Sequence, residues 1–367
     1  MADCRPPSKA SNFATSDHGR AWYATRKLTL VNATTEVRRS AIAAGLVMAQ
    51  LFQRTARQHY LIGVVSAQTD HGTTQPTFPM QLDIFEHSRD VVLRNAAMDA
   101  LRERDTGACA QAVATLAAEY STDPLLPALD LLCEKLRSPT PNPISREAAI
   151  AILQETRGTI AAAAHKVFGR AAQEWLSPLW AELAAAIAKY PFDSGNESLH
   201  SAPLLLHAGR WADAAGRIES IDSWRRQPAP LAWMIEARCR LGGFDAIWPL
   251  LAELAWMAPR RAQALTPRLE LPALDWLVRG FDAEFEGEGS PDDFSWLPAW
   301  ALIADGRLAE GLRLAKDGAH TLPESCARVV LGLLALERQG RHGELVENRR
   351  KLREAQPALF AHYMQDR

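Results

Sequence analysis

Apolar residues recur at helical spacing along most of this chain, beginning near Met80 and continuing towards its C-terminal end. In this region apolar positions fall at i, i+3, i+4 and i+7, and Gly, Pro and Asp separate the successive stretches. Such spacing is typical of amphipathic α-helices that follow one another with short turns. We therefore expect an all-α fold over residues 80–367.

The first helices can be placed by their boundary signals. The pattern predicts a helix over residues 88–103, a turn at 105–107 and a return helix over 108–120. Three prolines in residues 138–143 should interrupt the array, because proline lacks a backbone donor and pushes the preceding residue out of helical geometry. Ser145 should then cap the helix that follows.

Glycines in the second half of the chain share a period. Gly209 and Gly243 stand 34 residues apart, and so do Gly306 and Gly340. A short apolar stretch of helical spacing precedes each of these glycines, and another follows it. A 34-residue period is the spacing of helix–turn–helix repeats, which stack into a solenoid. At the turn between two helices a glycine often adopts positive φ, so we expect Gly306 to hold such a turn.

The unit around Gly306 resembles a tetratricopeptide repeat (TPR). That family places small residues seven positions before and five after the turn glycine, here Ala299 and Gly311. An apolar residue, Leu302, lies between, and Pro323 stands where the next repeat begins. About five hairpins carry part of this pattern. The resemblance implies a right-handed α-solenoid of antiparallel helix hairpins whose concave face binds other proteins.

Differences in composition divide the chain into three parts. Residues 1–79 lack sustained helical periodicity and are rich in Thr, Ser, Ala and Arg, which is typical of a poorly ordered segment. Two alternatives stay open: a start-site extension ahead of Met80, or an organellar transit peptide, because the segment is Arg-rich and poor in acidic residues. We expect an N-terminal helical array over residues 80–190 and TPR-like repeats over 191–367.

Charge argues against nucleic acid and membrane partners. Residues 1–79 hold nine Lys and Arg against four acidic residues, which leaves 32 basic and 39 acidic residues in the helical part. A mildly acidic surface lacks the basic field that nucleic acid or anionic lipid requires. Residues 155–170 resemble a DNA-binding helix-turn-helix, but the second helix would be mostly Ala. No run reaches the roughly 18–20 apolar residues of a membrane span.

Signatures of enzyme and metal sites are missing from the sequence. The five cysteines form no C-x-x-C pair, and their wide scatter fits reduced thiols in the cytoplasm. The chain has no phosphate-binding loop, no H-E-x-x-H helix and no G-x-S-x-G elbow. Residues 281–289 are acidic but lack the residue order of a calcium loop. We therefore nominate no catalytic, cofactor-binding or metal-binding residue.

Candidate partner-binding residues follow from the resemblance. In TPR-like arrays, residues ten, six and three positions before the turn glycine commonly line the concave groove, and exposed Trp and Arg dominate peptide recognition. The positions at or beside that groove are Trp233, Arg240, Trp296, Trp300, Glu337 and Arg338. We expect a cytoplasmic, bacterial scaffold or adaptor that binds another protein or peptide. The alternative is a regulatory protein that senses a peptide or small ligand.

Overall fold

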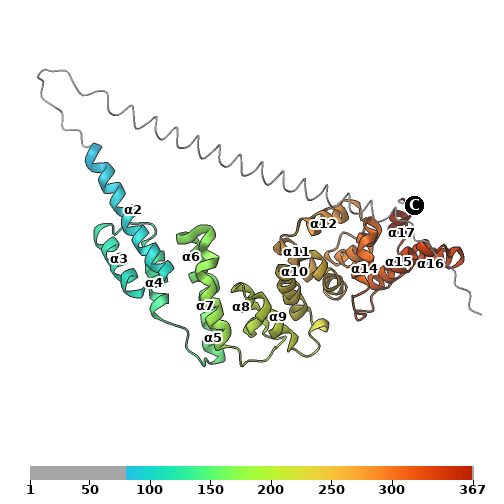
Figure 1. The fold of residues 1–367 in the computed structure, drawn as a ribbon, viewed down its shortest axis with the longest axis horizontal. Helices are drawn as coiled ribbons and strands as arrows, with labels where there is room; N and C mark the ends of the chain where they lie inside the picture. The colour runs from blue at the N-terminus through green and yellow to red at the C-terminus, as the bar shows by residue number, and fades with distance from the viewer. Residues whose placement is uncertain (1–79, 366–367) are drawn as a thin grey trace, which may run out of the picture. The chain divides into compact units, whose positions relative to one another are not determined.

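The computed structural model of the chain describes residues 80–365 (Figure 1). These residues contain helices and connecting turns but no strand, so the all-α prediction is confirmed for them. The expectations for residues 1–79 lie outside the described residues. The chain divides into two units between Phe78 and Pro79, and all described residues belong to the second unit.

The α-helices are labelled as in Figure 1. They are α2 (Met80–Glu103), α3 (Thr106–Glu119), α4 (Leu126–Arg137), α5 (Arg146–Glu155), α6 (Ala161–Phe168), α7 (Ala172–Ala186), α8 (Ser201–His207), α9 (Trp211–Glu219), α10 (Pro228–Met257), α11 (Pro259–Leu269), α12 (Pro272–Glu284), α13 (Leu297–Ala304), α14 (Ala309–Leu312), α15 (Leu322–Gln339), α16 (His342–Ala355) and α17 (Pro357–Gln365). Shorter turns of other helical types are η1 (Thr156–Ile160), η2 (Gly169–Ala171), η3 (Glu197–Leu199), η4 (Trp224–Arg226), η5 (Pro291–Trp296) and η6 (Gly306–Leu308).

Both predicted N-terminal helices are present, but α2 begins at Met80, eight residues before the predicted start at residue 88. The side chain of Asp105 caps α3 by accepting hydrogen bonds from the backbone N–H groups of Gly107 and Ala108, both at 2.9 Å. The return helix therefore starts at Thr106, inside the predicted turn. The proline-rich residues 138–143 contain no helix. As predicted, Ser145 caps α5, where its hydroxyl accepts from a backbone N–H at 3.2 Å.

Three helix hairpins share one turn geometry. A residue with positive φ ends the first helix of each, namely Arg104 (φ 58°), Gly209 (φ 71°) or Gly340 (φ 68°). The following N–H donates back to a carbonyl in the last helical turn, which is the Schellman arrangement. The donor–acceptor pairs are Asp105 to Ala100 at 3.0 Å, Arg210 to Leu205 at 2.9 Å and Arg341 to Leu336 at 3.3 Å. The recurring feature is therefore the left-handed residue, which is not always Gly.

The expectation for Gly306 is wrong. It is not among the positive-φ residues but begins η6 after Asp305, whose carboxylate accepts from the Arg307 N–H at 3.0 Å. The extended backbone of Asp305 separates α13 from η6 and its side chain caps η6, so no left-handed residue is needed. Gly243, by contrast, has φ 70° and breaks α10 into two helical halves. Pro323 stands in the first turn of α15, where the resemblance placed the start of a repeat.

Packing follows chain order through most of the described residues. Helices α2 to α4 contact one another in sequence, and so do α6 to α13, with α15 to α17 continuing the series (Figure 1). Two hydrophobic cores result. One contains buried side chains between Ala97 and Ala237, and the other buries side chains between Ala202 and Tyr363. Helices α8 to α10 contribute side chains to both cores and so join them.

Candidate binding cleft between α9, α10 and the loop before α15

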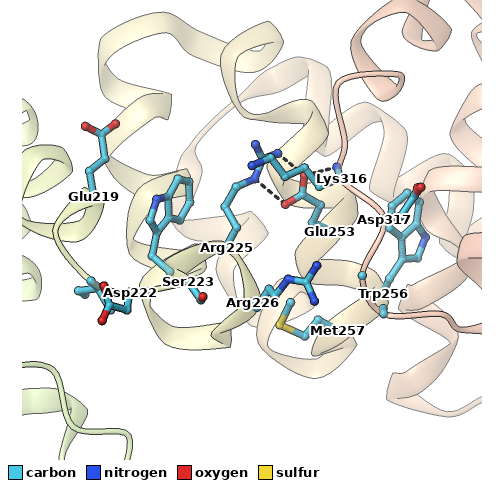
Figure 2. Close-up of a pocket in the computed structure, with 14 residues that line it drawn as sticks. Glu219, Asp222, Ser223, Arg225, Arg226, Glu253, Trp256, Met257, Lys316 and Asp317 are labelled. Atoms are coloured by element: carbon cyan, nitrogen blue, oxygen red, sulfur yellow. Dashed lines mark hydrogen bonds and ion pairs between the residues drawn. The ribbon is translucent and has the colours of Figure 1, made fainter.

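A cleft of about 410 Å³ lies where three segments distant in sequence meet (Figure 2). Residues 219–226, at the end of α9 and in η4, form one wall, and the end of α10 forms the floor with Trp256 and Met257. The loop of residues 316–319 supplies the opposite wall. The geometry of this cleft depends on what holds that loop in place.

The loop exists because α14 is very short. A TPR-like second helix would continue towards Pro323, but α14 ends at Leu312 and residues 313–321 form an irregular connection. Glu253 on α10 is only 5% exposed, and its carboxylate accepts from the Lys316 backbone N–H at 2.7 Å. A buried carboxylate requires donors, and a helical Lys316 N–H would be bonded within its own helix. The buried charge therefore favours the irregular path of this loop.

Arg225 completes the environment of Glu253. Its Nε donates to the Glu253 carboxylate at 2.9 Å and its terminal nitrogen makes a second bond to the same group (Figure 2). The same terminal nitrogen lies 3.5 Å from the Leu314 carbonyl oxygen. A paired guanidinium and carboxylate with parallel bonds is among the stronger and more directional contacts in proteins. This contact ties η4 to α10 and to the loop.

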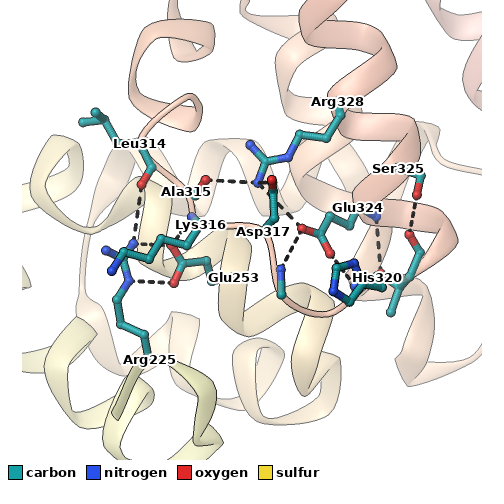
Figure 3. A network of polar contacts seen from close by, with 12 residues as sticks. Arg225, Glu253, Leu314, Ala315, Lys316, Asp317, His320, Glu324, Ser325 and Arg328 are labelled. Carbon is teal, nitrogen blue, oxygen red and sulfur yellow. Dashed lines mark hydrogen bonds and ion pairs between the residues drawn. The ribbon is translucent and has the colours of Figure 1, made fainter. Parts of the chain in front are cut away.

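A second buried carboxylate holds the other end of the loop. Glu324 on α15 is 4% exposed and accepts from the backbone N–H groups of Gly318 at 3.3 Å and His320 at 2.7 Å (Figure 3). Arg328, one turn further along α15, donates to the Ala315 carbonyl at 3.0 Å and lies 2.7 Å from Asp317. The loop is thus anchored from α10 and from α15, and both walls of the cleft are preorganised.

The cleft lining includes two tryptophans, two exposed cations and the exposed carboxylate of Asp222, and none of these three charged groups makes an ion pair among the described residues. Arg226 and Lys316 are exposed, and neither side chain makes an ion pair with another described residue. Trp224 is half-buried beside them, with the Arg225 guanidinium 5.8 Å from its ring centroid. Trp256 is buried and its Nε1–H has no acceptor within the described part of the chain. These groups suit a ligand with a carboxylate and an apolar surface.

The structure does not gather the three predicted groove tryptophans in one cleft. Trp300 is 2% exposed, so its assignment as an anchor on the groove surface is wrong: its ring lies in the C-terminal core. Gly280 leaves room for it, since an added Cβ there would lie 2.7 Å from the Trp300 ring. Trp233 and Trp296 are half-buried, and their role in partner binding stays a prediction.

Trp233 belongs to a small aromatic cluster. Its ring is parallel to that of His200, with centroids 5.7 Å apart, and Phe192 meets it edge-on at the same distance. Burial lowers the pKa of His200 to about 4, and the charge of Arg217 acts in the same direction. The neutral ring is consistent with its Nδ1, which accepts from the Ala202 N–H at 3.3 Å. The contacts of Trp233 with His200 and Phe192 are therefore those of packed side chains.

The predicted charged residues have different surroundings. Arg240 lies 3.2 Å from Glu270 and makes an exposed ion pair. Glu337 accepts a hydrogen bond from the Tyr363 hydroxyl, which holds α17 against α15. The Glu337 carboxylate thus has an internal partner, and its role at the groove edge stays a prediction. Arg338 is exposed and makes no ion pair with any described residue.

The sequence did not lead us to nominate three exposed residues that line clefts in the structure, namely Trp276, Arg226 and Lys316. Trp276 is 58% exposed, and the buried positions of its helix are Leu274, Leu277 and Phe281. Helical spacing places Trp276 off that stripe, so the signal was present in the sequence. Arg226 and Lys316 gave no such signal, because their meeting depends on the path of residues 313–321.

Residues 80–365 contain neither a metal-binding cluster nor a membrane-spanning helix. No group of three or more His, Cys, Asp or Glu side chains there is arranged to hold a metal ion. None of the helices in this range combines the length and the apolar character needed to cross a bilayer. Compared with protein-family models, curated proteins and solved structures, the chain matches none of them.

Proposed function

We propose that this chain is a scaffold or adaptor protein, a TPR-like right-handed α-solenoid that binds a segment of another protein. The binding site in this proposal is the cleft between η4, the end of α10 and the loop of residues 313–321. The partner segment offers a carboxylate to Arg226 and Lys316 and an apolar side chain to Trp224. The proposal covers protein–protein interaction and assigns the chain no catalytic step.

One observation carries the proposal: two exposed cations without partners stand beside a tryptophan on walls that buried carboxylates fix. Preorganised walls reduce the ordering cost of binding, and Trp and Arg are the residue types enriched at binding hot spots. The sequential packing of helix hairpins supports the solenoid arrangement, because each hairpin buries its apolar face against the next. No described group in the cleft lining forms a nucleophile–base pair.

Affinity capture from lysate of the native host tests the proposal. The bait is the full chain, compared with a double variant, Arg226→Glu with Lys316→Glu, that replaces both unpaired cations of the cleft with carboxylates. Arg170→Glu with Arg353→Glu is the matched control, since both residues are exposed and have no ion-pair partner among the described residues. We expect a protein that the wild type and the control retain and the cleft variant loses. A set of captured proteins identical for all three baits would contradict the proposal.

A regulatory role is the second candidate, and the volume of the cleft favours it. About 410 Å³ falls within the roughly 300–1,000 Å³ of small-molecule sites. The two roles differ in whether the protein partner is still captured when small molecules have been removed from the lysate. A scaffold retains its partner from lysate freed of small molecules by dialysis. A ligand-dependent regulator loses the partner after dialysis and regains it when the low-mass fraction is returned.

A further inference from the structure

A second cleft of about 410 Å³ lies between α12, α13 and α17. Trp276 and Arg279 line it from α12, Trp300 from α13 and His362 from α17, with Glu284 at the end of α12. It shares no lining residue with the cleft at η4. Its chemistry is unusual because it combines an exposed aromatic face with buried polar atoms that lack partners among the described residues.

Trp276 supplies the aromatic face. It is 58% exposed, while the core-facing side chains of α12 lie on another stripe of the helix. Arg279 stands three residues further along, so the two side chains share one face of the helix. Packing of the described residues does not account for an indole at this position, since most of its surface faces water.

Two side chains that line this cleft, Trp300 and Arg279, carry N–H donors without a strong acceptor among the described residues. Trp300 is 2% exposed, yet its Nε1–H has no hydrogen-bond partner among the described residues. Arg279 donates from Nε to the Asp275 carbonyl at 3.2 Å and makes no ion pair within the described part of the chain. Indole and guanidinium N–H groups can only donate. A ligand that satisfies both groups must therefore bring an acceptor.

His362 and Glu284 complete the polar lining. The His362 ring is stacked on Trp300 with centroids 5.5 Å apart, and its Nε2 is buried without a partner among the described residues. Its Nδ1 lies 3.9 Å from the Glu284 carboxylate. Glu284 is the single carboxylate of the lining, and more than half of its side chain is exposed to water. The polar groups of this cleft that lack a hydrogen-bond partner are therefore mainly donors.

We propose that this cleft binds a carboxylate attached to an aromatic ring. The ring stacks on the exposed face of Trp276, and the carboxylate accepts hydrogen bonds from Arg279 and from the Trp300 Nε1–H. This chemistry has two sources: a free small aromatic acid, or the C-terminal aromatic residue of a peptide. A cationic ligand over Trp276 is disfavoured, because it would leave the Trp300 donor unmet and would meet Arg279.

Titration followed by indole N–H resonances tests the proposal on the full chain. Phenylacetate is the probe, and phenylacetamide and phenethylamine are its neutral and cationic counterparts. The Trp276→Phe and Trp300→Phe variants identify the two signals by their loss. We expect phenylacetate to shift both signals to saturation and to bind about tenfold or more tightly than either counterpart, as for hydrogen bonds to a charged group. Preferential binding of phenethylamine, or two unmoved signals, would overturn the proposal.

Variants separate ligand contacts from effects on folding. Arg279→Gln should weaken phenylacetate binding about tenfold or more, while Trp276→Ala should weaken it roughly two- to tenfold. Both residues are exposed, so stability should change little. Glu284→Gln should leave binding unchanged or tighter, and Arg170→Gln serves as a surface control. Unaltered affinity in Arg279→Gln would contradict the assigned role of the guanidinium.

Two peptides distinguish the sources. One hexapeptide ends in a free Phe carboxylate, and its counterpart ends in a Phe amide. If the natural ligand is a protein C-terminus, the free-acid peptide should bind about tenfold or more tightly than phenylacetate, because flanking residues add contacts. If it is a small aromatic acid, the peptide should bind no better than phenylacetate. Equal binding of the two peptides would contradict recognition of a carboxylate.

Discussion

Replacing Glu253 with Gln tests the buried network that shapes the cleft at η4. The substitution keeps the shape of the side chain and removes its charge. Glu253 is 5% exposed, and its carboxylate accepts from the Arg225 guanidinium and from the Lys316 backbone N–H. The introduced amide can still accept through its one oxygen, so part of this hydrogen bonding persists.

The expected cost follows from the surroundings of the two charges. Removing one partner of a fully buried pair costs about 3–5 kcal/mol, because the other charge is left uncompensated. The Arg225 side chain is 23% exposed, so water partly solvates it and the cost is smaller. Each hydrogen bond to a charged group contributes about 1.5–3 kcal/mol. With one acceptor retained, we expect Glu253→Gln to lower the free energy of unfolding by about 2 kcal/mol.

Urea denaturation and amide hydrogen exchange together measure this effect. Denaturation gives the loss in unfolding free energy, and exchange reports on the Lys316 N–H that Glu253 accepts. Glu236→Gln on the same helix is the control, because its pair with Arg268 is more exposed and should contribute about 0–1 kcal/mol. Exchange at Lys316 should accelerate in Glu253→Gln and not in the control. Equal stability of the two variants with unchanged exchange at Lys316 would refute the role assigned to the carboxylate.

Three further predictions concern the turns, the tryptophans and pH. Gly340→Ala should lower the unfolding free energy by about 1–2 kcal/mol because φ is 68° there, whereas Gly306→Ala should change it by less than about 0.5 kcal/mol in urea denaturation. Trp300→Ala should cost about 3–5 kcal/mol, and the exposed Trp276→Ala should leave the melting temperature nearly unchanged. Burial lowers the pKa of His200 from 6.5 to about 4, so the unfolded state is protonated at a higher pH than the folded state. The free energy of unfolding should therefore fall as the pH drops from 6.5 to about 4. His200→Asn, which keeps a capping acceptor, should make the fall less steep, while His207, whose pKa burial also lowers to about 4, retains its share; an unchanged profile would show that His200 does not contribute.

Local signals in the sequence predict the helices well. The capping residue Ser145 and the starting residue Pro323 act through hydrogen bonds or geometry within one turn, so they need no tertiary information. The turn at Gly306 could not be predicted in the same way. An extended residue with a capping carboxylate and a left-handed glycine can each connect two successive helices, and the repeat pattern does not distinguish them.

The candidate sites depended on contacts that spacing cannot supply. Trp300 and Trp276 both lie on helices, and only the helical stripe of α12 indicates that one of them faces water. Lys316 lines the cleft at η4 because the buried carboxylate of Glu253, 63 residues earlier, accepts a hydrogen bond from its backbone N–H. An interaction over that separation leaves no periodic trace in the sequence.

Hydrogen exchange of the full chain with its captured partner is the most direct measurement of the proposed role. The account predicts protection over residues 222–226 and 314–320, on the two walls of the cleft, together with unchanged exchange in α5 and α6. The Arg226→Glu and Lys316→Glu double variant should show no protection at equal partner concentration. Protection confined to another part of the chain, or protection that the double variant retains, would contradict binding in this cleft.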